Sequence, residues 1–73
     1  GEVRDFYTTG DIARALELIR NLDISYIYVG RLERTAYDPI GLAKFERMVE
    51  EGYLTVSYSN EEVKIYKELV DRR

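Results

Sequence analysis

The sequence predicts a small α/β domain of the α+β class, in which two helices cover one face of a mixed three-stranded sheet. Two segments carry apolar residues at helical spacing, and three shorter segments are rich in β-branched and aromatic residues. The chain has 73 residues and therefore forms one domain at most. A chain this short buries about 60% of the surface that it exposes when unfolded, which leaves little interior for an elaborate polar site.

The N-terminal half of the chain begins with residues 1–10, which predict either a short extra strand or an extended arm. A helix is expected over 11–22, because Thr9 or Asp11 can accept hydrogen bonds from its first free N–H groups. The apolar residues that recur on one face of this helix are Ile12, Ala15, Leu16, Ile19 and Leu22, with Leu18 flanking them.

The segment 24–29 predicts the first main strand. It is apolar on both faces of a period-two pattern, which is typical of a strand covered on both sides, and Gly30 ends it. Tyr26 and Tyr28 share one face of the strand with Ile24. If the helices cover the other face, these rings form a partly exposed amphipathic patch.

The longest irregular stretch is expected at 30–39. Asp38 and Pro39 then start a second helix, as an N-cap followed by proline at the first helical position. Gly41 in the first turn of this helix costs about 1 kcal/mol in helix propensity. Gly52 is a natural left-handed C-cap. The buried stripe predicted for this helix consists of Leu42, Phe45, Met48 and Val49.

The C-terminal part of the chain predicts a hairpin. Residues 53–59 alternate, with Leu54, Val56 and Tyr58 on one face, and a polar turn at 60–62 leads into a third strand. The competing interpretation is a terminal helix, because Ser59-Asn60-Glu61-Glu62 also fits a capping box. The apolar face of that helix would comprise Val63, Tyr66, Leu69 and Val70. We favour the hairpin, and we expect a right-handed parallel crossover between the first two main strands.

The composition excludes several classes of function. The chain has neither cysteine nor histidine, so it cannot form a disulfide, a zinc–thiolate site or a catalytic triad, and we expect no metal and no cofactor. The formal net charge is −3 and the basic residues are scattered, which argues against nucleic acid as a partner. No apolar run approaches the roughly 20 residues of a membrane span, so we expect no direct membrane insertion.

Much of the chain resembles one family of larger proteins. The segments that carry the resemblance are Asp11–Leu22, Asp23–Gly30, Leu32–Tyr37, Gly41–Phe45, Tyr58–Asn60 and Val63–Tyr66. They are similar to a region near the C-terminus of multi-spanning prokaryotic membrane proteins that carry the YYY domain. Those proteins look like distant relatives of GT-C-type membrane glycosyltransferases. One position departs from the pattern, because Ile40 stands where an acidic residue is expected after the proline.

The resemblance implies that residues 1–73 form a soluble domain excised from a larger membrane protein. Its partner would be the remainder of that protein, and its place would be outside the membrane, on the extracytoplasmic side. The acidic motifs that bind metal and lipid-linked sugar in GT-C enzymes lie in loops between membrane spans. None of those motifs falls in this chain, so the resemblance implies a non-catalytic accessory domain and carries over no catalytic residue.

A candidate ligand site follows the first main strand, where open α/β sheets place their ligands. Arg31 and Arg34 could clamp a phosphate or carboxylate, while Glu33 and Tyr37 could bind sugar hydroxyls. Gly30 would allow a sharp turn or the close approach of a ligand. The alternative is that Gly30 only ends the strand and that the other residues are ordinary surface and packing residues of a loop. The segment lacks the glycine-rich sequence that binds phosphate in known motifs.

A candidate interface is formed by tyrosines. The chain has seven of them, and tyrosine is enriched at interfaces because it combines apolar area with a hydroxyl group. We expect Tyr26, Tyr28 and Tyr58 to contribute to such a surface; ordinary sheet packing is the alternative. The sequence thus leaves three hypotheses, which are an accessory domain of a membrane protein, an interaction module using the tyrosine face or a sheet edge, and a sugar-phosphate binder.

Overall fold

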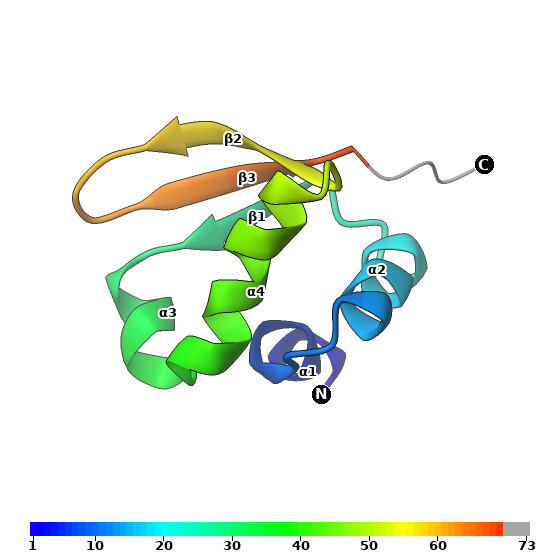
Figure 1. Cartoon of the computed structure of the whole chain (residues 1–73). Coiled ribbons are helices and arrows are strands. Elements are labelled where there is room, and N and C mark those ends of the chain that lie inside the picture. The colour runs from blue at the N-terminus through cyan, green and yellow to red at the C-terminus, as the bar shows by residue number, and fades with distance from the viewer. Residues whose placement is uncertain (70–73) are drawn as a thin grey trace.

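The computed structural model describes residues 1–69, which form one sheet layer with helices on one side of it (Figure 1). The α+β class predicted from the sequence is confirmed. The elements in chain order are α1 Glu2–Thr8, α2 Ile12–Asn21, β1 Tyr26–Val29, α3 Arg31–Ala36, α4 Pro39–Glu50, β2 Leu54–Ser59 and β3 Lys64–Glu68.

The three strands of the sheet lie in the order β1-β3-β2, and both neighbouring pairs are antiparallel. The predicted hairpin of β2 and β3 is confirmed, and the alternative terminal helix is wrong for the described residues; Val70, one of its expected positions, lies outside them. The expectation of a mixed sheet is corrected. Strands β1 and β2 run in the same direction, but β3 lies between them and pairs with each.

The N-terminal segment is helix α1, not the strand or extended arm expected for residues 1–10. Val3, Phe6 and Tyr7 stand three and four residues apart, which is helical spacing, and Phe6 is buried in the core. An ion pair between Asp5 and Arg14, at 2.9 Å, connects α1 to α2. The helix therefore forms because its apolar face has a core to pack against.

Helices α2 and α4 begin where the sequence predicts. The side chain of Asp11 accepts a hydrogen bond from the Ala13 N–H at 2.9 Å, and that of Asp38 accepts one from the Ile40 N–H at 2.8 Å. Gly52 follows α4 with φ of 87°, the left-handed conformation expected of a C-cap glycine. These ends fix the length of each helix and the direction in which the chain leaves it.

The core lies between the helices and the inner face of the sheet. Strand β1 buries only Ile27 and Val29, so the expectation that it is covered on both sides is wrong. It is an edge strand with helices on one face. The fully or almost fully buried apolar residues are Phe6, Ala15, Leu18, Ile19, Ile27, Val29, Phe45, Met48, Leu54 and Tyr66.

Gly41 allows α1 to contact α4 closely. A Cβ atom added at this position would lie 2.5 Å from the Tyr7 carbonyl oxygen and 2.7 Å from that of Thr8. The backbone at the end of α1 thus occupies the space that a side chain would need. The glycine lowers the helix propensity of α4, but it is required by the packing of two helices.

Candidate functional site

The outer face of the sheet carries three tyrosines. Tyr26, Tyr28 and Tyr58 are 57%, 50% and 52% exposed. Ile65 of β3 is opposite Tyr28 on one side and opposite Tyr58 on the other, so the three side chains form a row across the sheet. We call Tyr26, Tyr28, Tyr58 and Ile65 the tyrosine face. The structure therefore brings together all three residues predicted for an interface.

A β-bulge places Tyr58 on this face. Val56 is opposite Tyr66 and Tyr58 is opposite Ile65, so Ser57 is an extra residue on β2. Such an insertion reverses the alternation of the strand beyond it. Val56 and Tyr58 were expected to share a face with Leu54, and this is wrong for Tyr58. The bulge turns its ring away from the buried side and next to Ile65.

Tyr28 also connects the tyrosine face to the neighbouring elements. Its carbonyl oxygen accepts a hydrogen bond from the Tyr7 hydroxyl at 2.8 Å, which joins β1 to α1. Its ring crosses the backbone at Gly30, where an added Cβ would lie 2.8 Å from the ring carbon Cε1. Gly30 thus permits the close approach expected for a ligand, but the group that approaches is a ring of the same chain.

The segment expected to be an irregular loop contains the short helix α3. The Glu33 carboxylate accepts a hydrogen bond from the Gly30 N–H at 2.8 Å, which stabilises the first turn of this helix. A glutamate at the third helical position is a recognised capping signal, and it was present in the sequence. The role of Glu33 in the structure is therefore to start a helix.

Arg31 and Arg34 both contact the turn between β2 and β3. Arg31 forms an ion pair with the Glu62 carboxylate at 2.8 Å, and Arg34 donates a hydrogen bond to the Glu62 carbonyl oxygen. The two guanidinium groups do converge, as a clamp requires. They converge on Glu62, a residue that sequence reasoning did not select because it is distant in the chain.

Tyr37 lies away from the two arginines, against α1. Its ring stacks on that of Tyr7, with centroids 4.9 Å apart and planes 3° from parallel, and the guanidinium of Arg4 lies 5.9 Å from its centroid. Burial together with Glu33 and Tyr37 raises the pKa of the Tyr7 hydroxyl. The five residues predicted for one ligand site are thus divided between the sheet turn and the N-terminal helix.

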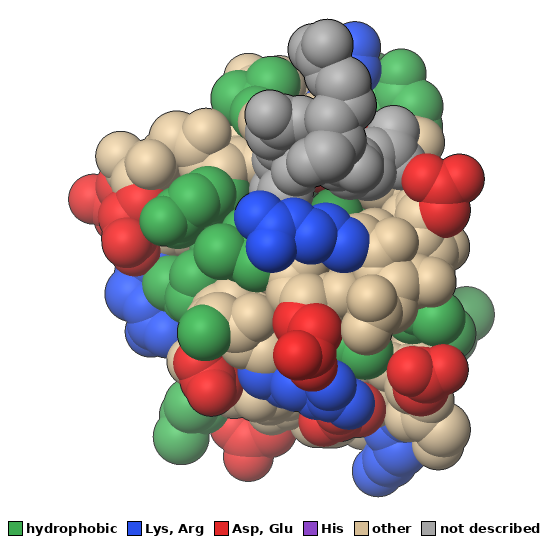
Figure 2. Space-filling view, turned by 90° about the vertical axis from the view of Figure 1, so that its right-hand side faces the viewer, with side chains coloured by type: hydrophobic (Ala, Val, Ile, Leu, Met, Phe, Trp, Pro, Cys, Tyr) green, Lys and Arg blue, Asp and Glu red, His purple; other side chains and the backbone are tan. Residues whose placement is uncertain are grey.

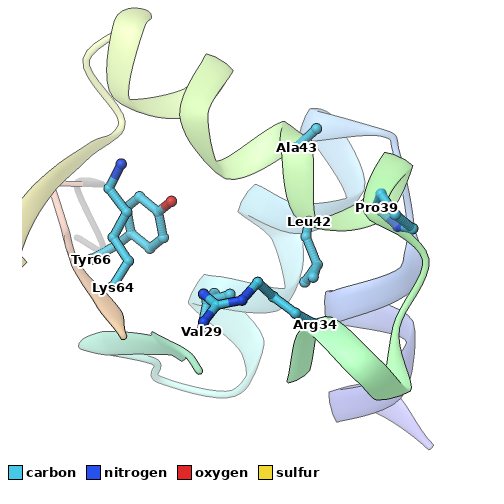
Figure 3. A pocket seen from close by; sticks show the side chains of 7 residues that line it. All are labelled: Val29, Arg34, Pro39, Leu42, Ala43, Lys64 and Tyr66. Carbon is cyan, nitrogen blue, oxygen red and sulfur yellow. The ribbon is translucent and has the colours of Figure 1, made fainter. Parts of the chain in front are cut away.

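A cavity of about 470 Å³ lies between α3, α4 and the end of the sheet (Figure 3). Lys64 and Tyr66 project from β3 on one wall, and α4 supplies the opposite wall. Arg34 reaches into the space between them. The remaining lining is apolar and consists of Val29, Pro39, Leu42 and Ala43. Of the residues predicted for a ligand site, Arg34 is the one that lines this cavity.

Glu46 of α4 neutralises the charge of Lys64 on the polar wall of the cavity. Its carboxylate forms an ion pair with Lys64 at 2.8 Å and accepts a hydrogen bond from the Tyr66 hydroxyl. These two contacts, from Lys64 and then from Tyr66, lower the pKa of Glu46. Burial and the neighbouring carboxylate raise the pKa of Tyr66. Tyr66 therefore remains a neutral donor at physiological pH.

Lys44 is fully buried at the junction of α1 and α4. Its ammonium group donates a hydrogen bond to the Gly41 carbonyl oxygen at 2.8 Å and lies 4.1 Å from the centroid of Phe45. Burial is the main cause that lowers its pKa to about 8, and the charge of Arg47 adds to it. No carboxylate is shown bonded to Lys44 in the described residues. Lysine side chains are rarely fully buried, so a buried position for Lys44 could not be expected from the residue type.

The described residues show no arrangement suited to catalysis by a metal ion. No group of three acidic side chains within them could hold a metal ion. None of their helices is long and apolar enough to cross a membrane. Acidic and basic side chains are interspersed on the face shown in Figure 2, which carries no continuous basic stripe.

Comparisons with known proteins place this chain in no family. No family model, no curated protein and no solved structure matches it. The resemblance to the YYY-domain membrane proteins therefore stays a prediction.

Proposed function

We propose that this protein is a non-catalytic interaction module that packs its tyrosine face against a partner protein. The observation that supports this is the one-sided sheet. Helices cover its inner face, while the tyrosines at 26, 28 and 58 remain half-exposed around Ile65 on the outer face. A cluster of large aromatic side chains on an otherwise small domain is typical of an interface.

The chemistry of this face suits a protein surface better than a small ligand. Tyrosine offers a large rigid contact area with few rotatable bonds and a hydroxyl that can hydrogen-bond at the rim. In the neighbouring row of the face, Tyr26 is opposite Lys67, which is in turn opposite Thr55; Lys67 and Thr55 are exposed and polar. An aromatic centre with a polar border is the usual anatomy of a protein interface.

We further propose that the partner is the extramembrane part of a multi-spanning protein. This is what the resemblance of the sequence to YYY-domain proteins implies, and it makes the module an extracytoplasmic accessory domain of a glycosyltransferase-like protein. The lack of histidine and cysteine supports the non-catalytic role.

Site-specific photo-cross-linking in the native protein tests the tyrosine face. A photoreactive phenylalanine analogue at Tyr28 is expected to cross-link to a defined partner segment. The same analogue at Ile40, which is 71% exposed on α4, is the matched control and is expected to give none. Equal cross-linking from both positions, or none from Tyr28, would contradict the proposal.

The cavity beside α4 supports a second candidate function, the binding of a sugar phosphate or another anion with an apolar part. Arg34 and Lys64 lie at its rim and apolar side chains line its floor. Both cations already have partners, Glu62 and Glu46, which an anion would have to displace or share. An amide-shift titration with glucose 1-phosphate is expected to move the signals of Arg34 and Lys64. A silent titration of the folded chain would eliminate this function.

A further inference from the structure

Two cations reach the cavity beside α4 from different elements. Arg34 projects from α3, and Lys64 projects from β3 on the wall across from α4 (Figure 3). A guanidinium group carries five N–H donors, and Arg34 uses one nitrogen to bind the Glu62 carbonyl oxygen. An ammonium group carries three, and the Lys64 nitrogen lies 2.8 Å from one oxygen of Glu46. Donors for an additional anion therefore remain on both side chains.

The wall that α4 supplies is apolar and open to solvent. Pro39 and Ala43 are exposed, and Leu42 is half-buried. Val29 and Tyr66 also line the cavity, but both residues are almost fully buried. A ligand held by the two cations would therefore place the rest of its body mainly against the side chains of α4.

This wall suits an apolar body better than a sugar. Among the described residues, the polar side chains that line the cavity are Arg34, Lys64 and Tyr66, and the Tyr66 hydroxyl is already bonded to Glu46. Sugar hydroxyl groups against the α4 wall would gain no side-chain hydrogen bond from it. Apolar carbon atoms in the same place would be removed from water together with the exposed carbon atoms of the wall, which is favourable.

The position of the two cations favours phosphate as the anionic group. A phosphate monoester carries a charge of about −1.5 to −2 at neutral pH and has three acceptor oxygens. A carboxylate carries one charge and has two oxygens in one plane. Arginine binds phosphate through two parallel hydrogen bonds, and lysine binds it as a point charge. Phosphate is therefore better suited than carboxylate to accept from Arg34 and Lys64 at once.

We propose that this cavity binds a phosphate monoester whose body is an apolar ring, of which phenyl phosphate is the simplest example. Arg34 and Lys64 hold the phosphate, while the side chains of α4 contact the ring. Glu46 then shares Lys64 with the phosphate. A ring is preferred to an alkyl chain because a rigid body loses less conformational freedom on binding. This inference names the ligand class for the anion-binding function proposed above and rests on that function.

An amide-shift NMR titration of the full chain with phenyl phosphate, glucose 1-phosphate and phenol tests the ligand class. Glucose 1-phosphate keeps the phosphate but has a polar body, and phenol keeps the ring but has no phosphate. Phenyl phosphate is expected to shift the signals of Arg34, Ala43 and Lys64. It is also expected to bind at least about tenfold more tightly than each of the other two probes.

The titration distinguishes failure of the ligand class from failure of the site. Equal or tighter binding of glucose 1-phosphate would overturn the inference and leave the anion-binding function intact. Equal or tighter binding of phenol would show that the cations do not hold the ligand, which overturns both. Binding of neither phosphate ester to the folded chain would also overturn both.

Arg34→Gln and Arg31→Gln form a matched pair of variants. Both arginines are exposed and both contact Glu62, but of the two only Arg34 lines the cavity. Arg34→Gln is expected to weaken the binding of phenyl phosphate about tenfold or more, whereas Arg31→Gln is expected to change it by less than about twofold. An equal loss in both variants would show that general charge near the turn, and not the cavity, attracts the phosphate, and would contradict the proposal.

Discussion

The ammonium group of Lys44 lies 3.4 Å from the Tyr7 carbonyl oxygen, at the point where α1 ends against α4. Carbonyl groups at the end of a helix have no partner within it, and a cation there also meets the negative end of the helix dipole. Lys44, which belongs to α4, thus caps the C-terminal end of α1. The contact exists because Gly41, one turn earlier, leaves room for the α1 backbone.

Replacing Gly41 by alanine is expected to destabilise the protein by about 2 kcal/mol or more. Helix propensity alone would favour the change by about 1 kcal/mol, but the new Cβ would meet backbone oxygen, which cannot move without displacing α1. Urea unfolding measures the effect. Gly10→Ala is the control, because its Cβ would make an ordinary contact at 3.7 Å with Ile40. A stabilised Gly41→Ala variant would show that α1 does not pack as described.

The lowered pKa of Lys44 predicts that stability increases with pH in the weakly alkaline range. The unfolded chain binds a proton to Lys44 up to about pH 10.5, whereas the folded chain releases it near pH 8. Between these values the unfolded state holds more protons, so the free energy of unfolding should rise by about 2 kcal/mol from about pH 7.5 to 9.5. Chemical unfolding at a series of pH values measures this rise.

The variant Lys44→Met should remove this rise and be at least as stable as the parent at pH 7. Methionine fills a similar volume without a buried charge, although the Tyr7 carbonyl oxygen then loses a donor. If the variant keeps the alkaline increase, another group is responsible for it and the assignment to Lys44 is wrong.

The raised pKa of Tyr66 predicts that the free energy of unfolding falls at higher pH. Its folded-state pKa is raised above the ordinary value of 10, so its contribution is complete below pH 10 and is lost as the pH rises further. Tyr66→Phe should cost about 1 kcal/mol at neutral pH through the lost hydrogen bond to Glu46, and this cost should shrink above pH 10. Tyr58→Phe is the control, because the Tyr58 hydroxyl contacts only the exposed side chain of Asn60 among the hydrogen bonds described. A cost that does not change with pH would argue against the Tyr66–Glu46 contact.

Local patterns in the sequence were sufficient for the elements that depend on them. Asp11, Asp38 and Gly52 cap helices where expected, and the hairpin at 54–68 follows from alternation and a polar turn. These features are decided within a few neighbouring residues. The exposure of Tyr26 and Tyr28 was expected only if helices cover the other face of β1, whereas the apolar pattern of the strand indicated cover on both sides, which is wrong.

Features that depend on distant contacts could not be predicted in this way. The insertion of β3 between β1 and β2 depends on which edge of β1 the returning chain meets, and no local pattern encodes that choice. The position of Tyr58 depends on the bulge at Ser57. The pairing of Arg31 and Arg34 with Glu62 joins residues about thirty positions apart, so the predicted anion clamp was already occupied by the chain itself.

Hydrogen exchange of the isolated chain, and of the same sequence within the larger protein that we propose contains it, tests the interaction module most directly. If the tyrosine face is an interface, amides of β1 and of the Tyr58–Ile65 region are expected to gain protection in that larger protein. The amides of α2, on the opposite layer, should exchange as they do in the isolated chain. Unchanged exchange across the sheet, or protection confined to the helices, would contradict the account.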